Sequence, residues 1–92
     1  MSWWLVMAKR LEKGFVRIVL KEVSSDGNQM FYDGPLMRYE NAFEILSKYK
    51  ECFDSNLMFD MLLVSGAHVW MPIDLVQSAM YLPESFLGNN NE

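Results

Sequence analysis

The chain has 92 residues, 51% of them hydrophobic, and a formal net charge of −4. This length predicts one domain with enough apolar content for a core, because small chains depend on disulfides or metals mainly below about 40 residues. The single cysteine, Cys52, excludes an internal disulfide. With no signal-peptide pattern and no apolar run long enough to span a bilayer, we expect a cytoplasmic protein that does not contact membranes.

The charge is divided unevenly along the chain. Residues 1–21 hold five basic residues and one acidic residue, a net of +4, whereas residues 22–92 hold three basic and eleven acidic residues, a net of −8. This asymmetry indicates that the two parts present different surfaces to their surroundings.

Three strands are predicted in the N-terminal third. Trp3–Lys9 is a nearly continuous apolar run, Phe15–Val23 alternates, and Gln29–Tyr32 is short. Ser24–Asn28 should join the last two strands as a hairpin turn, because its Asp-Gly pair tolerates the positive φ angles of such turns. Charge falls on only one face of the second strand, so the other face should point into the core: Val16, Ile18 and Leu20.

The clearest amphipathic helix runs from Tyr39 to Phe53 and follows the strand-ending segment Asp33-Gly34-Pro35, where Gly34 is expected to permit an unusual backbone angle. Arg38 stands where Ser, Thr or Asp would be expected as the N-cap. The apolar stripe predicted to pack on the sheet consists of Tyr39, Ala42, Phe43, Ile45, Leu46, Tyr49 and Phe53.

The C-terminal part predicts a second hairpin and a second helix. Leu57–Val64 is the most hydrophobic stretch, Ser65-Gly66-Ala67 is a turn signal, and His68–Met71 reads as the returning strand. A capping-box pattern then predicts a short helix over Asp74–Leu82. The polar residues 88–92 are expected to fray.

This order, β-β-β-α-β-β-α, predicts an α+β fold. We expect an antiparallel sheet of four or five strands, with the long helix on one face and a short C-terminal helix. Residues 1–87 should form a single compact domain, followed by the polar tail 88–92.

The residues that carry most catalytic chemistry are scarce. His68 is the only histidine, and a catalytic histidine needs a nucleophile or a carboxylate held beside it. One histidine and one cysteine cannot supply the usual zinc ligands, and the isolated glycines form no phosphate-binding loop. We therefore predict that the protein is not an enzyme and has no cofactor or metal. A small enzyme or ligand-binding domain around His68 stays as a third hypothesis.

The surplus of aromatic residues and methionines favours a protein-binding module, since interface cores are rich in both. The leading prediction is a small acidic inhibitor or accessory factor that occupies a surface, such as a basic groove, on a larger protein. By general analogy alone, phages and mobile elements carry such inhibitors of host nucleases or defence complexes. A second copy of the same chain, forming a homodimer, is an alternative partner. The predicted partner-binding residues are Trp3, Trp4, Met37, Arg38, Glu40, Glu44, Glu51 and Asp54.

A nucleic-acid-binding module is the alternative. Exposed aromatic rings beside phosphate-binding cations are how sheet surfaces hold single strands. The acidic remainder of the chain would repel a polyanion beyond the basic part. The residues that would bind nucleic acid are Lys9, Arg10, Lys13, Arg17 and Lys21, next to the two N-terminal tryptophans.

Overall fold

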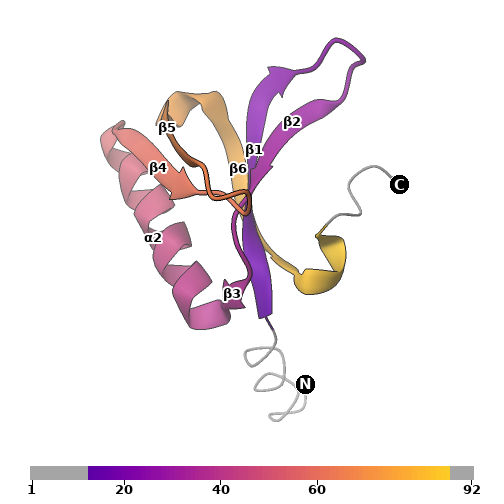
Figure 1. Ribbon diagram of the computed structural model, residues 1–92. Helices are drawn as coiled ribbons and strands as arrows, with labels where there is room; N and C mark the ends of the chain where they lie inside the picture. The colour runs from indigo at the N-terminus through magenta and orange to yellow at the C-terminus, as the bar shows by residue number, and fades with distance from the viewer. Residues whose placement is uncertain (1–12, 88–92) are drawn as a thin grey trace, which may run out of the picture.

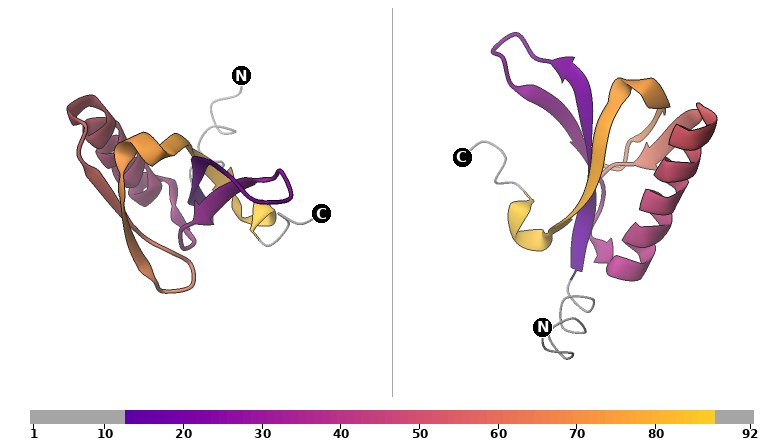
Figure 2. Two further views of the ribbon diagram at one scale, coloured as in Figure 1. Left: turned by 90° about the horizontal axis from the view of Figure 1, so that it is seen from above. Right: turned by 180° about the vertical axis from the view of Figure 1, so that it is seen from behind.

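The computed structural model describes residues 13–87 and confirms an α+β fold with an antiparallel sheet and one long helix (Figure 1). The predicted strand Trp3–Lys9 and the tail 88–92 lie outside the described residues. In Figures 1 and 2, the helix lies at one side of the molecule and the tip of the first hairpin at the other.

The main sheet is built around one long strand, β1 (Lys13–Val23). Strands β2 (Gln29–Asp33) and β3 (Met37–Arg38) pair with successive parts of one edge of β1, and β6 (Val76–Pro83) pairs with the opposite edge. The sheet thus has four strands, and all its pairings are antiparallel. Because β1 is paired on both sides, it forms the centre of the fold.

The first hairpin has the predicted turn. Ser24 donates its backbone N–H to the Asn28 carbonyl at 2.8 Å, and Gly27 adopts a φ of 88°. Glycine suits this position because it has no Cβ to clash when φ is positive. The hairpin of β1 and β2 is therefore confirmed.

The two faces of β1 are covered differently. Val16, Ile18 and Leu20 are buried in the main core, as predicted. On the other face Phe15 is also fully buried, and Arg17 places its guanidinium 4.0 Å from the centre of the Phe31 ring.

The helix α2 (Tyr39–Ser55) is confirmed, with Arg38 as an N-cap that makes no side-chain capping bond. Asn56 ends the helix in the left-handed conformation, with a φ of 56°. The predicted apolar stripe is wrong at two positions, because Phe43 and Phe53 are 55% and 61% exposed. The helix packs instead through a stripe rotated away from them, with Ala42 and Cys52 buried and Ile45, Leu46 and Tyr49 partly buried.

The second hairpin forms a separate sheet of two strands, β4 (Met58–Leu62) and β5 (His68–Pro72). Its turn contains Gly66 with a φ of 95°. One face of this hairpin supplies core residues, with Phe59 and Met71 buried in the same cluster as residues of the helix and the main sheet. The prediction of two strands here is confirmed, but they do not join the main sheet.

The helix predicted over Asp74–Leu82 is wrong for most of its length. Only Ile73–Leu75 (η1) forms a 3₁₀ turn, and the chain then extends as β6 until a second 3₁₀ turn at Glu84–Phe86 (η2). The pairing of β6 with β1 runs from Val76–Leu20 to Pro83–Gly14. These long-range hydrogen bonds outweigh a local capping signal, since helix propensity is a weak preference.

Gly34 also differs from expectation, because it is not among the glycines with a positive φ. Its backbone N–H bonds the Val16 carbonyl at 2.9 Å, and an added Cβ would lie 2.7 Å from Cε of Met61. Close packing between the two hairpins, rather than backbone freedom, explains glycine here.

Within residues 13–87, no helix combines the length and the apolar character needed to cross a membrane.

Candidate protein-binding surface

The second hairpin presents an exposed face that is largely apolar. Successive side chains of a strand point to opposite sides, so the residues between the buried ones face outward. The most exposed are Trp70, Met58 and Leu62, at 62%, 54% and 50%. We call this surface the hairpin face, defined by Met58, Asp60 and Leu62 on β4 and by His68, Trp70 and Pro72 on β5.

Strand register brings the side chains of the hairpin face together. Asp60 is the direct partner of Trp70, and Leu62 is the partner of His68. The His68 ring stacks on the Trp70 ring, with centroids 4.1 Å apart and planes 25° from parallel. Nε2 of His68 also lies 2.9 Å from Oδ2 of Asp60. Trp70 is therefore exposed, while the His68 ring covers one face of its indole ring.

The helix contributes one charge to this cluster. Lys48 of α2 pairs with Oδ1 of Asp60, so both carboxylate oxygens have partners. The Lys48 ammonium and, after it, the His68 ring lower the pKa of the Asp60 carboxyl below its ordinary value of 3.8. Asp60 is thus ionised at neutral pH, and it ties the helix to the hairpin face.

His68 and Cys52, the two side chains of the described chain best suited to nucleophilic or acid–base chemistry, contact different groups. His68 has its carboxylate, but no nucleophilic side chain among residues 13–87 is hydrogen-bonded to it. Cys52 is buried and its Sγ donates to the Met58 carbonyl at 3.4 Å. Within the described part of the chain, no group of three or more histidine, cysteine, aspartate or glutamate side chains is placed to hold a metal ion.

The predicted partner-binding residues fall in different places. Trp3 and Trp4 lie outside the described residues. Met37 is partly buried and packs against the core, whereas Arg38 is exposed at the helix start. The acidic residues all lie on the exposed side of α2: Glu40, Glu44, Glu51 and Asp54.

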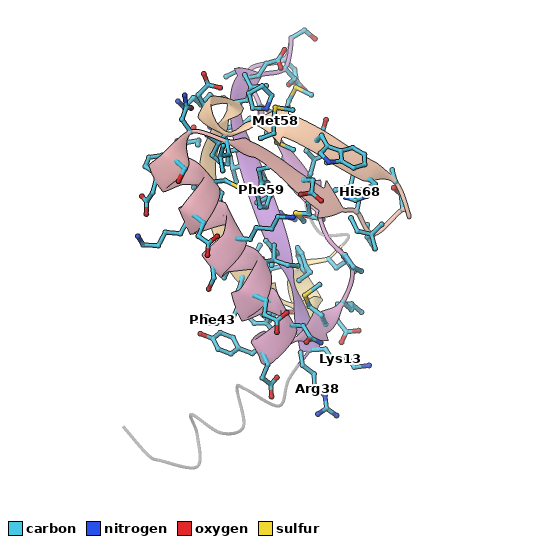
Figure 3. The ribbon with its side chains drawn as sticks, turned by 90° about the vertical axis from the view of Figure 1, so that its left-hand side faces the viewer. Lys13, Arg38, Phe43, Met58, Phe59 and His68 are labelled. Carbon is cyan, nitrogen blue, oxygen red and sulfur yellow. The ribbon has the colours of Figure 1, made fainter. Side chains whose placement is uncertain are left out.

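Two of these glutamates border a hollow near the start of α2. Glu40 and Glu44 line it together with the aromatic residues Tyr39 and Phe43, and its volume is about 400 Å³. Phe43, labelled in Figure 3, points outward at this end of the helix. Asp54 is farther along and pairs with Lys50 at 3.0 Å.

The basic residues predicted to bind nucleic acid are only partly available. Lys9 and Arg10 lie outside the described residues, and Lys13 and Lys21 are exposed near the two ends of β1. Arg17, between them, forms two hydrogen bonds to the Asp33 carboxylate, at 2.7 and 3.0 Å. The central cation of this set is therefore engaged within the fold.

Sequence reasoning missed the hairpin face. The prediction makes Leu57–Val64 a hydrophobic strand of a hairpin and assigns it no exposed face, although Asp60 within it marks the side that faces water. Period-two alternation around Asp60 places Met58 and Leu62 on that same side. The pairing with Trp70 needed the register of the hairpin, which the sequence does not state.

No protein-family model, curated protein or solved structure matches the chain.

Proposed function

We propose that this protein is a non-enzymatic binding module that uses the hairpin face to occupy a surface on a larger protein. The observation that carries the proposal is Trp70, a large apolar side chain that is 62% exposed yet stacked and held in place. Tryptophan dominates binding hot spots, and a side chain that is already ordered loses less entropy when a partner covers it.

Exposed apolar residues also flank the first strand of the hairpin in the chain. Leu57, directly before β4, is 57% exposed, and Val64, two residues after β4, is 53% exposed. Monomeric proteins rarely expose large contiguous apolar patches unless these are functional. The cluster of exposed apolar side chains around the hairpin supports a surface that a partner covers.

In this proposal the protein acts as an inhibitor or accessory factor and does not transform a substrate. Its acidic net charge of −4 suits a partner with a basic surface. An inhibitor carried by a phage or mobile element, directed at a host nuclease or defence complex, is the type we favour. That preference rests on general analogy only.

Replacing Trp70 tests the proposal. The wild type and Trp70→Ala serve as baits for affinity capture from a host lysate, and the captured protein is then purified for binding measurements. We expect one larger protein at stoichiometric yield with the wild type, and about thirtyfold or more weaker binding by the variant, as for other hot-spot residues.

The matched control is Phe86→Ala, which removes an aromatic ring that is 49% exposed on η2, away from the hairpin. It should bind like the wild type, and circular dichroism should show that both variants are folded. Equal binding by Trp70→Ala and the wild type would contradict the proposal. Salt-sensitive binding of oligonucleotides instead would favour the nucleic-acid alternative.

A further inference from the structure

We infer, on the basis of the proposed function, that the partner segment covering the hairpin face is basic. It presents an apolar residue to Trp70 and places arginine or lysine side chains opposite Glu44 and Glu51 of α2. Two features support this inference together: the exposed apolar residues of the hairpin face and the carboxylates on the neighbouring side of α2.

The ion pair between Lys48 and Asp60 fixes where the helix edge lies. Because Lys48 reaches an outward residue of β4, the side of α2 that bears Lys48 borders the hairpin face. Glu44 is four residues before Lys48 and Glu51 is three residues after it, and such spacings share one side of a helix. Figure 3 shows the exposed side of α2 and the outer side of the hairpin, with His68 and Met58, turned toward the same viewer.

The charges along this side are not balanced within the described chain. The helix α2 contains four carboxylates and two lysines, a net of −2. Both lysines are already paired, Lys48 with Asp60 and Lys50 with Asp54. Glu44 and Glu51 are exposed and have no ion-pair partner among the described residues.

This excess of negative charge favours one kind of partner at the hairpin face over another. A second copy docked through the same face would bring two acidic helix edges together, and juxtaposed like charges disfavour association. A segment with cations flanking an apolar residue would instead satisfy both the carboxylates and the exposed rings. Its guanidinium or ammonium groups would meet carboxylates that are not already neutralised.

An unbiased selection tests the inference. Random displayed peptides are selected against the full-length protein, and the strongest binders are synthesised. We expect peptides with arginine or lysine on either side of an apolar residue, with affinity that falls as salt is raised to about 0.15 M. The double variant Glu44→Gln, Glu51→Gln should bind them about tenfold more weakly, from about threefold for each exposed ion pair.

The control is Glu22→Gln, which removes an exposed carboxylate near the tip of the first hairpin, far from α2 in Figure 1. It should leave peptide binding unchanged. Selected peptides that need Trp70 but are neutral, acidic or indifferent to the double variant would overturn the basic partner and leave the proposed function intact.

Three other outcomes are informative. Peptides that bind Trp70→Ala as well as the wild type, or a failure to select any peptide, would count against the proposed function itself. Sedimentation that shows a dimer lost in Trp70→Ala would identify a second copy as the occupant and overturn the inference.

Discussion

At the scale of single residues, Asp60 connects the helix to the second hairpin. Its carboxylate accepts from Lys48 on α2 and from His68 on β5, and it lies directly opposite Trp70. Side-chain pairs across a strand pair contribute modestly, and ion pairs near the surface contribute about 0–1 kcal/mol. The role of Asp60 is therefore more to fix the arrangement of the hairpin face than to stabilise the whole fold.

We predict that Asp60→Asn lowers the free energy of unfolding at pH 7 by about 0.5–1 kcal/mol. The pKa of Asp60 is lowered in the folded state from 3.8, so its contribution is present in full above about pH 5. It is lost as the pH falls through the folded-state pKa. Urea denaturation of both proteins at pH 7 and near pH 3 should show a difference that shrinks in acid.

Asp74→Asn is the matched control for this experiment. Asp74 is exposed in η1 and has no ion-pair partner among residues 13–87. Its replacement should change the stability by less than about 0.5 kcal/mol at either pH. A difference between wild type and Asp60→Asn that stays constant from pH 7 to pH 3 would show that the Asp60 charge does not contribute.

At the scale of elements, the pairing of β1 with β6 decides the C-terminal half of the fold. The two strands are closely packed at Gly14, where an added Cβ would lie 2.5 Å from Cζ of Tyr81 and closer still to the Leu82 carbonyl oxygen. Any larger residue would push β6 away from β1. Glycine at this position is a requirement of close strand and ring packing.

We predict that Gly14→Ala destabilises the protein by about 1–3 kcal/mol, the usual cost of overpacking. Gly34→Ala is the comparison, because its Cβ would meet only the flexible end of Met61 within 3 Å. It should cost less than Gly14→Ala. Thermal or urea unfolding measures both variants, and a Gly14→Ala protein as stable as the wild type would refute the close packing described here.

At the scale of the whole molecule, the elements differ in how firmly they are held. β1 is hydrogen-bonded to strands along both edges, whereas β4 and β5 pair only with each other and expose one face. Amides in well-paired core strands exchange slowest, and binding surfaces are drawn from the less stable parts. The surface proposed to bind a partner thus lies on the less firmly held sheet.

We predict that hydrogen exchange is slowest in the part of β1 that pairs with β6, residues 14–20, and faster in Met58–Leu62 and His68–Pro72. Exchange measured by NMR or mass spectrometry checks this order. Equal protection in both sheets would mean that the molecule opens only as a whole. Added protection of the hairpin on binding of a selected peptide would support the proposed surface.

Several elements could be predicted because their signals are local. The Asp26-Gly27 turn depends on backbone freedom at Gly27. The helix, predicted over Tyr39–Phe53 and found over Tyr39–Ser55, depends on apolar spacing within one segment. The inward face of β1 followed from alternation, since charge fell on one side only. Each of these needs only neighbours in the chain.

Other features depended on contacts between distant residues. The segment 76–83 has the local pattern of a capped helix, but it forms a strand because its backbone pairs with one edge of β1. Phe43 and Phe53 are exposed because another side of α2 packs against the core. More than one side of the helix carries apolar residues, so the packing partner decides which side is buried. Sequence periodicity cannot choose between them.

The sequence by itself determined the α+β class, the two turns, the main helix and the acidic excess of the C-terminal part. Only the tertiary structure decided that Trp70 stacks on His68, that Lys48 reaches Asp60, and that the hairpin face lies beside the side of α2 that bears Lys48. The physical reason is distance along the chain. Turns and helices form from residues a few positions apart, whereas this surface is assembled from a helix and two strands whose register and packing no local pattern specifies.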